Sequence, residues 1–197
     1  SRYETVLAEH GYDSVLIASG AAPYRYGDDQ SWVFHGYGPF VHWTGLAGQE
    51  HSWLWFRPGR APVLWLYQPV DFWHATPELP DEPWRAYFEL HRRQRPEAPA
   101  LTQPGRLAVI GDPALLAGVP GEHNPGPLLA ALDETRVRKT GYELACLAEA
   151  NRRALAGHRA ARDAFAEGES EFGISLAYQR ATRQREAEAP YHSIIGL

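Results

Sequence analysis

The sequence contains no methionine and a single cysteine, Cys146, among its 197 residues. One cysteine cannot form an internal disulfide, which is typical of proteins from a reducing compartment rather than of disulfide-stabilised secreted domains. The first eleven residues, SRYETVLAEHG, also lack the apolar region of a secretory signal. These absences predict a cytoplasmic protein. Because even an initiator methionine is missing, we expect the chain to begin inside a longer gene product.

Long apolar runs and an excess of positive charge are absent as well. No run approaches the roughly 20 apolar residues of a membrane span. The formal net charge is −5 and the sequence pI is about 6.0, which argues against nucleic acid or an anionic membrane as a partner. With 44% hydrophobic and 22% charged residues, the composition is that of a globular protein with one domain or two small ones.

The familiar motifs of catalytic and metal sites are missing too. None of the nine histidines belongs to a His-x₃-His pair, and there is no Cys-x₂-Cys pair. There is no glycine-rich phosphate loop and no Gly-x-Ser-x-Gly nucleophile elbow. We therefore assign no catalytic residue, no metal ligand and no cofactor to this chain. Cys146 lies within a predicted helix, and we interpret it as a small core residue.

The first part of the chain, residues 1–134, combines helical and strand patterns without regular alternation. A helix ends at Gly11, and further short helices are predicted at 114–118 and 126–134. Buried strands are predicted at four segments, namely 14–19, 52–56, 61–67 and 106–112. Residues 57–60, Arg-Pro-Gly-Arg, predict a turn that joins the two central strands as a hairpin. The expected fold class is α/β, with a mixed sheet flanked by helices.

The second part, residues 135–197, is rich in alanine, glutamate and arginine. Thr140 and Glu143 have the spacing of a capping box, which predicts the start of a long helix that ends at Gly168. Ser170 is the predicted cap of a second helix. Residues 193–197 have the pattern of a strand that is just beginning. Two helices and one strand cannot bury a core of their own, so we expect this part to be incomplete.

Three groups of side chains leave alternatives open. The aromatic residues of the central strands, Trp53 and Trp55 among them, fit core packing better than base stacking, because the acidic charge gives stacking no electrostatic support. Asp28 and Asp29 are adjacent, so their side chains point apart and would not form an acid–base pair. They fit either a solvated turn or a functional site. Tyr191, after Pro190, fits either packing or a substrate contact.

Five segments of the chain resemble, in the same order, segments of one enzyme family. Residues 64–74, LWLYQPVDFWH, are similar to the family's LWFYLPVDYWH, and residues 138–150, RKTGYELACLAEA, are similar to FKTEYELACMREA. The other three are residues 18–20 with 27–29, which resemble HSG…FLDD, residues 157–172, which resemble GHRAAEEAF…GMSEF, and residues 189–197, which resemble VPYSNIVAL. The family is that of the bacterial Xaa-Pro dipeptidases, or prolidases, in the subgroup that includes organophosphorus acid anhydrolase.

This resemblance implies a fold and an activity. Residues 1–134 would form a creatinase/prolidase-type amino-terminal domain, and residues 135–197 would begin a pita-bread metallopeptidase domain. The full-length protein would be a homodimeric dipeptidase that hydrolyses Xaa-Pro dipeptides with two divalent metal ions of the manganese type. The family's metal ligands match no residue here and would follow Leu197, so this chain alone is expected to be inactive. His35 stands where the family has a lysine.

The resemblance also implies two site residues. The aspartate that matches Asp29 reaches from one subunit into the active site of the dimer partner, and the tyrosine that matches Tyr191 lines the same substrate pocket. Both residues are therefore candidates for substrate binding. The alternative function is a non-catalytic dimerisation and substrate-gating module, which a stop codon directly after Leu197 would favour.

Overall fold

The computed structural model describes residues 2–70, 72, 83–102, 105–185, 188–189 and 193–196. The chain divides into two compact units, Ser1–Arg136 and Val137–Leu197. No helix among the described residues has the length and apolar character needed to cross a membrane. That residues 135–197 begin a pita-bread domain stays a prediction.

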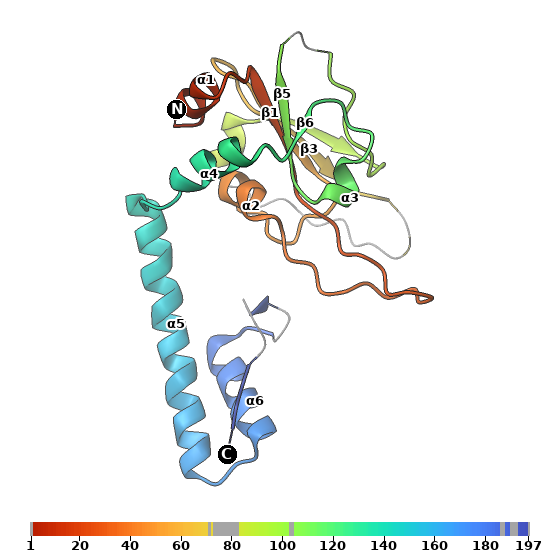
Figure 1. The fold of residues 1–197 in the computed structure, drawn as a ribbon. Coiled ribbons are helices and arrows are strands. Elements are labelled where there is room, and N and C mark those ends of the chain that lie inside the picture. Colours follow the sequence, from red (N-terminus) through yellow and green to blue (C-terminus); the bar gives the residue numbers. More distant parts are fainter. Residues whose placement is uncertain are drawn as a thin grey trace. The chain divides into compact units, whose positions relative to one another are not determined.

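A six-stranded mixed sheet forms the centre of the first unit, in the order β4-β3-β2-β1-β5-β6 (Figure 1). The strands are β1 (Ser14–Ala18), β2 (Trp53–Phe56), β3 (Val63–Tyr67), β4 (Glu89–Arg93), β5 (Leu107–Ile110) and β6 (Glu122–His123). β2 pairs antiparallel with both β1 and β3, and the other pairings are parallel. The mixed α/β fold predicted from the sequence is confirmed.

Helices and two apolar clusters cover the two faces of this sheet. The helical elements are α1 (Arg2–Glu9), α2 (Gly38–Thr44), the 3₁₀ helix η1 (Pro83–Tyr87), α3 (Pro113–Leu116) and α4 (Gly126–Glu134). Leu54 belongs to the cluster that includes residues of α1, α2 and α4. Trp53 and Trp55 belong to the opposite cluster, with Leu116 of α3. Neighbouring residues of β2 thus face opposite ways, as strand geometry requires, and the prediction that both tryptophans are core residues is confirmed.

The central hairpin between β2 and β3 turns at residues 57–60, as predicted from the sequence. Arg60 N donates to Arg57 O at 3.2 Å, and Gly59 takes the left-handed backbone conformation with φ of 70°. Trp55 pairs with Val63 across the two strands. Pro-Gly in the turn therefore supplies both the fixed φ and the positive φ that this connection needs.

Two strands, one α-helix and the 3₁₀ helix η1 were not predicted. β4 has the sequence ELHRR and lies at the edge of the sheet, where most of its side chains are exposed or half-buried. β4 lacks the apolar pattern from which the other strands were predicted, because an edge strand packs only lightly against the core. The two-residue β6 and the short α2, with its Gly-Pro start, are too brief for periodicity to reveal.

The second unit is a pair of helices, α5 (Gly141–Ala166) and α6 (Glu171–Thr182). Both sides of the predicted capping box are present, since Glu143 N donates to Thr140 Oγ1 at 3.2 Å and Thr140 N donates to Glu143 Oε2 at 2.7 Å. Ser170 caps α6 as predicted. Gly157 allows close packing of the helices, because a Cβ there would lie 2.6 Å from side-chain atoms of Tyr178 and Thr182.

Two predictions about the second unit were wrong. Residues 193–196 lie outside any strand, although the sequence pattern predicted that a strand begins there. Cys146 is exposed rather than buried, although it lies inside α5 as expected. Helical periodicity shows which residues share a face, but not whether another element covers that face.

Hydrogen exchange should separate the two units in the 197-residue chain. Several large apolar side chains of the second unit are exposed, namely Leu144, Leu147, Leu155, Phe165 and Phe172. Such sparse packing lowers the free energy of local opening. We expect fast amide exchange in α6 and in residues 193–196, and slow exchange in β1, β2 and β5, measured by mass spectrometry. Uniformly slow exchange would contradict this and would show that the apolar face has found a partner.

Candidate functional site

The segment between β1 and α2 leaves the sheet from a base built on two buried serines. Ser19 N donates to Ser52 O at 2.8 Å, and Ser52 N donates to Ser19 Oγ at 2.9 Å. The Ser52 hydroxyl accepts from Tyr67 N at 2.9 Å and donates to Glu50 O at 3.0 Å. Both serines are fully buried, so these bonds satisfy polar groups that water does not reach. They fix the point at which the segment leaves the core.

Further contacts anchor each end of this segment to the loop formed by residues 47–50. Ala22 N donates to Glu50 Oε2 at 2.8 Å, and on the returning side Gly36 N donates to Ala47 O at 3.2 Å. Gly36 cannot carry a side chain without movement of its surroundings, because a Cβ would lie 2.7 Å from Ala47 O. The base is therefore specified by backbone approach as well as by hydrogen bonds.

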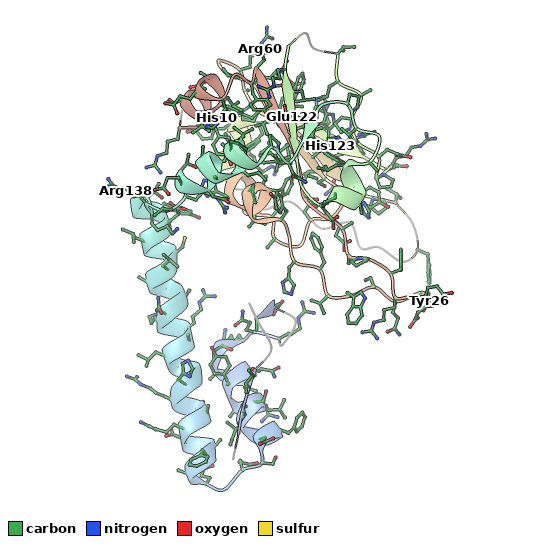
Figure 2. All side chains as sticks on the ribbon, viewed as in Figure 1. His10, Tyr26, Arg60, Glu122, His123 and Arg138 are labelled. Atoms are coloured by element: carbon green, nitrogen blue, oxygen red, sulfur yellow. The ribbon has the colours of Figure 1, made fainter. Side chains whose placement is uncertain are left out.

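Beyond this base, residues 23–33 form a small hairpin, which we call the arm. Tyr24 and Ser31 pair as an antiparallel bridge, and Trp32 N donates to Pro23 O at 3.1 Å. Gly27 takes a positive φ of 71° in the turn. Figure 2 shows Tyr26 at the end of the arm, away from Glu122 and His123 of the sheet.

The arm exposes large aromatic side chains. Tyr26 is fully exposed, Tyr24 is 74% exposed and Trp32 is 58% exposed. The Arg25 guanidinium lies 4.8 Å from the centre of the Trp32 ring, within the range of a cation–π contact. Aromatic residues gathered on a protruding hairpin are typical of an interaction surface. The sequence pattern alone did not predict an aromatic surface here.

The two adjacent aspartates of the arm differ in their hydrogen-bond partners. Asp28 Oδ1 accepts from Gln30 N at 3.1 Å, which closes a local turn. The Asp29 carboxylate makes no hydrogen bond or ion pair with any residue that the structure describes. Both side chains are exposed. Asp28 therefore has a structural partner, whereas Asp29 is available to bind a group from outside the unit.

The structure describes His35 and His51 but not Tyr191. Tyr191 lies outside the described residues, so its relation to Asp29 stays a prediction. His35 is exposed on the returning side of the segment. His51 was not singled out, yet it has a left-handed φ of 51° and its ring contacts Tyr67 edge-on, with centroids 5.3 Å apart. Burial lowers the pKa of His51, and Glu50 opposes this shift. A histidine with positive φ has no sequence signature.

The described residues do not fit a metal ion. No group of three or more His, Cys, Asp or Glu side chains within them could hold one. We expect titration calorimetry of the 197-residue chain with manganese to detect no tight stoichiometric site, because tight sites need several converging ligands. Binding at one ion per chain with micromolar or better affinity would contradict this.

The chain matches one protein family and several curated relatives. The family described as "Xaa-Pro dipeptidase, N-terminal domain" matches residues 1–133. A Xaa-Pro dipeptidase of Marinobacter nauticus is 70% identical over 197 residues, all of this chain and 46% of that protein. Proteins of the same name from Xanthomonas campestris and Stenotrophomonas maltophilia are 39% identical over 202 residues and 36% over 199.

The chain spans about half the length of the curated relatives it matches. The family match covers 133 of the 197 residues and includes the whole sheet and the arm. The chain belongs to the family of Xaa-Pro dipeptidase amino-terminal domains.

Proposed function

We propose that the protein to which this chain belongs is a metal-dependent homodimeric dipeptidase that hydrolyses Xaa-Pro dipeptides. The names of its relatives support the activity. The chain would supply dimer contacts and substrate-binding residues rather than the reacting groups. The observation that carries this role is the arm, which presents exposed aromatic rings and a carboxylate that has no partner among the described residues, on a hydrogen-bonded base.

In this proposal Asp29 binds the free amino group of the substrate. A dipeptide carries an ammonium group at its amino end, and a carboxylate held beside it makes a charge-assisted hydrogen bond. Because Asp29 has no competing partner among the described residues, it need not break an internal contact to bind. The hydrogen-bonded base would hold the start of the arm in place, so that the carboxylate would lose less entropy when it binds.

The aromatic residues of the arm have a separate role in the proposal. Tyr24, Tyr26 and Trp32 would bury their rings against the second subunit, which positions Asp29 across the interface. Aromatic side chains suit such contacts, because they bury a large area and have few rotatable bonds. Tyr191 would line the same substrate pocket.

The proposed dipeptidase would also need a pair of divalent metal ions, for which this chain supplies no assigned ligand. When bound, a pair of divalent ions would activate a water molecule and polarise the scissile carbonyl. The described residues offer no group that fits them, so we assign no metal ligand to these residues.

The test uses the full-length protein and the dipeptides Ala-Pro and Ala-Ala. We expect hydrolysis of Ala-Pro, little hydrolysis of Ala-Ala, loss of activity after chelation with EDTA, and recovery with manganese. The 197-residue chain is expected to be inactive under the same conditions. A full-length protein that dimerises but hydrolyses neither dipeptide at any metal concentration would overturn the proposal in favour of a dimerisation and substrate-gating module.

A further inference from the structure

Strand β4 ends the sheet on one side, so one of its two edges faces no other described strand. Its inner edge pairs parallel with β3: Glu89 N donates to Pro62 O at 2.9 Å, and Gln68 N donates to Arg93 O at 2.7 Å. Backbone groups of successive residues in a strand point to opposite edges. Every second residue of β4, beginning with Glu89, therefore faces β3, and the residues between them face outward.

The outward-facing residues of β4 are Leu90 and Arg92. Their backbone N–H and C=O groups make no hydrogen bond within the described part of the chain. A row of unpaired backbone groups on a strand edge is a template for another strand. The question is which strand this edge fits.

The charged side chains of β4 are placed symmetrically about its central residue, His91. Glu89 and Arg93 lie two residues to either side of it, and so on the same face of the sheet. Glu89 Oε1 lies 2.8 Å from His91 Nε2, which leaves Oε2 for a second partner. Arg93 Nη1 donates to Glu97 O at 3.0 Å, which leaves further N–H groups on the guanidinium. The strand therefore carries both halves of an ion pair, at matching distances from its centre.

Two copies of β4 fit each other in an antiparallel arrangement centred on His91. Each Glu89 then lies opposite Arg93 of the second copy, and directly opposed unlike charges stabilise a pair of strands. A slip of two residues in one direction would place Arg92 opposite itself, with like charges in contact. A slip in the other direction would leave Arg93 beyond the end of the paired strand. The charges thus select one register.

The outward-facing backbone groups select the same register. It places Leu90 opposite Arg92 of the second copy, and both of these residues point to the free edge. Each such pair exchanges both of its N–H···O=C bonds, as hydrogen-bonded pairs of antiparallel strands do. The backbone and the side chains therefore agree, although they involve different atoms.

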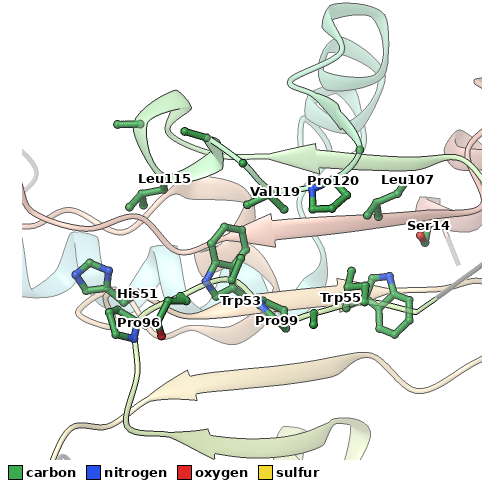
Figure 3. Close-up of a pocket in the computed structure, with 18 of the residues that line it drawn as sticks. Ser14, His51, Trp53, Trp55, Pro96, Pro99, Leu107, Leu115, Val119 and Pro120 are labelled. Carbon is green, nitrogen blue, oxygen red and sulfur yellow. The ribbon is translucent and has the colours of Figure 1, made fainter.

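A row of stacked groups reaches this edge on the face that carries Glu89. Figure 3 shows Trp55 on β2, at the side of a pocket of about 830 Å³ whose described lining includes no residue of β3 or β4. The Arg57 guanidinium lies 3.8 Å from the centre of a Trp55 ring. Trp55 stacks with Trp65 of β3 at 6.2 Å between centroids, and Trp65 stacks with His91 at 5.9 Å. The His91 side chain is 46% exposed, so the row ends at an accessible ring.

We propose that β4 pairs antiparallel with β4 of a second copy of the protein, with two-fold symmetry about His91, so that two sheets join into one. This contact is separate from the arm, and it requires neither Asp29 nor a metal ion. A single pair of five-residue strands buries little area. We therefore expect weak association that becomes visible only at high protein concentration.

The test follows the mass of the full-length protein by sedimentation over increasing concentration. We expect a reversible doubling of mass, whether the smaller species is a monomer or the dimer of the proposed function. Glu89→Arg and Arg93→Glu each place like charges opposite one another, so each should raise the dissociation constant of this step at least about fivefold. A mixture of these two variants places unlike charges opposite again, and it should associate about as well as the wild type.

Three further variants make the test specific. Arg92→Pro removes an outward N–H but no bond to β3, so it should abolish the doubling while the protein stays folded. Arg60→Glu makes the same change of charge as Arg93→Glu, at an exposed turn position, and should have no effect. Tyr24→Ala, on the arm, should leave the β4-dependent step intact, which separates this proposal from the proposed function.

The mixing experiment decides the matter even if Arg92→Pro fails to fold. No doubling of mass at any soluble concentration would overturn the proposal, and this includes the case in which the edge of β4 takes a different protein. Doubling that persists unchanged in both single charge variants would overturn it as well. So would a mixture of the two variants that associates no better than either one alone.

Discussion

Replacing Asp29 with asparagine in the full-length protein is expected to lower kcat/KM for Xaa-Pro dipeptides by about 10- to 150-fold. The substitution removes the negative charge but keeps the size of the side chain. A charge-assisted hydrogen bond to an ammonium group contributes about 1.5–3 kcal/mol, and each 1.4 kcal/mol is about a factor of ten. Steady-state hydrolysis of Ala-Pro measures this loss.

The neighbouring Asp28 is the matched control for this experiment. Its Oδ1 accepts from Gln30 N, and the side-chain oxygen of asparagine can accept the same bond. Asp28→Asn should therefore change kcat/KM by less than about twofold, because the residue serves the turn rather than the substrate. Neither variant should alter metal content or thermal stability, because both carboxylates are exposed. Equal, small effects at both positions would return Asp29 to the interpretation of a solvated turn.

Replacing Phe40 with alanine is expected to lower the free energy of unfolding of the first unit by about 3–5 kcal/mol. Phe40 lies in α2, is fully buried and belongs to the apolar cluster on the helix-covered face of the sheet. Its removal loses the transfer free energy of the ring and leaves a cavity. A change of this size is a large part of the roughly 5–15 kcal/mol that stabilises a typical domain. Urea unfolding followed by tryptophan fluorescence suits the measurement, because all seven tryptophans lie before residue 85.

Tyr24→Ala provides the comparison, since it truncates an aromatic ring of similar size that is 74% exposed. The free energy of unfolding should change by no more than about 0.5 kcal/mol, as for most surface substitutions. In the full-length protein the order should reverse for association: Tyr24→Ala should weaken the dimer, measured by sedimentation, if the arm contacts the second subunit. Similar unfolding losses in both variants would contradict the assignment of Phe40 to the core.

Local chemistry was enough to determine much of the secondary structure. The capping box at Thr140, the cap at Ser170 and the Pro-Gly turn before β3 each satisfy backbone groups within a few residues, so their effect does not depend on distant parts of the chain. The apolar runs of β1, β2, β3 and β5 also predicted strands correctly, because burial on both faces leaves a continuous apolar pattern.

Only the tertiary structure decided how these elements meet. The strand order places β1 between β2 and β5, which are far apart in sequence, and it puts the charged β4 at an edge. The sequence identified Asp28 and Asp29 as neighbours, but it could not show that Gln30 N donates to Asp28 while Asp29 has no partner in the described part of the chain. Likewise, helical spacing in α5 predicted an apolar face but not its exposure, nor that of Cys146. The physical reason is the same in each case: periodicity and caps act over a few residues, whereas burial and hydrogen-bond partners depend on contacts between segments that are distant in sequence.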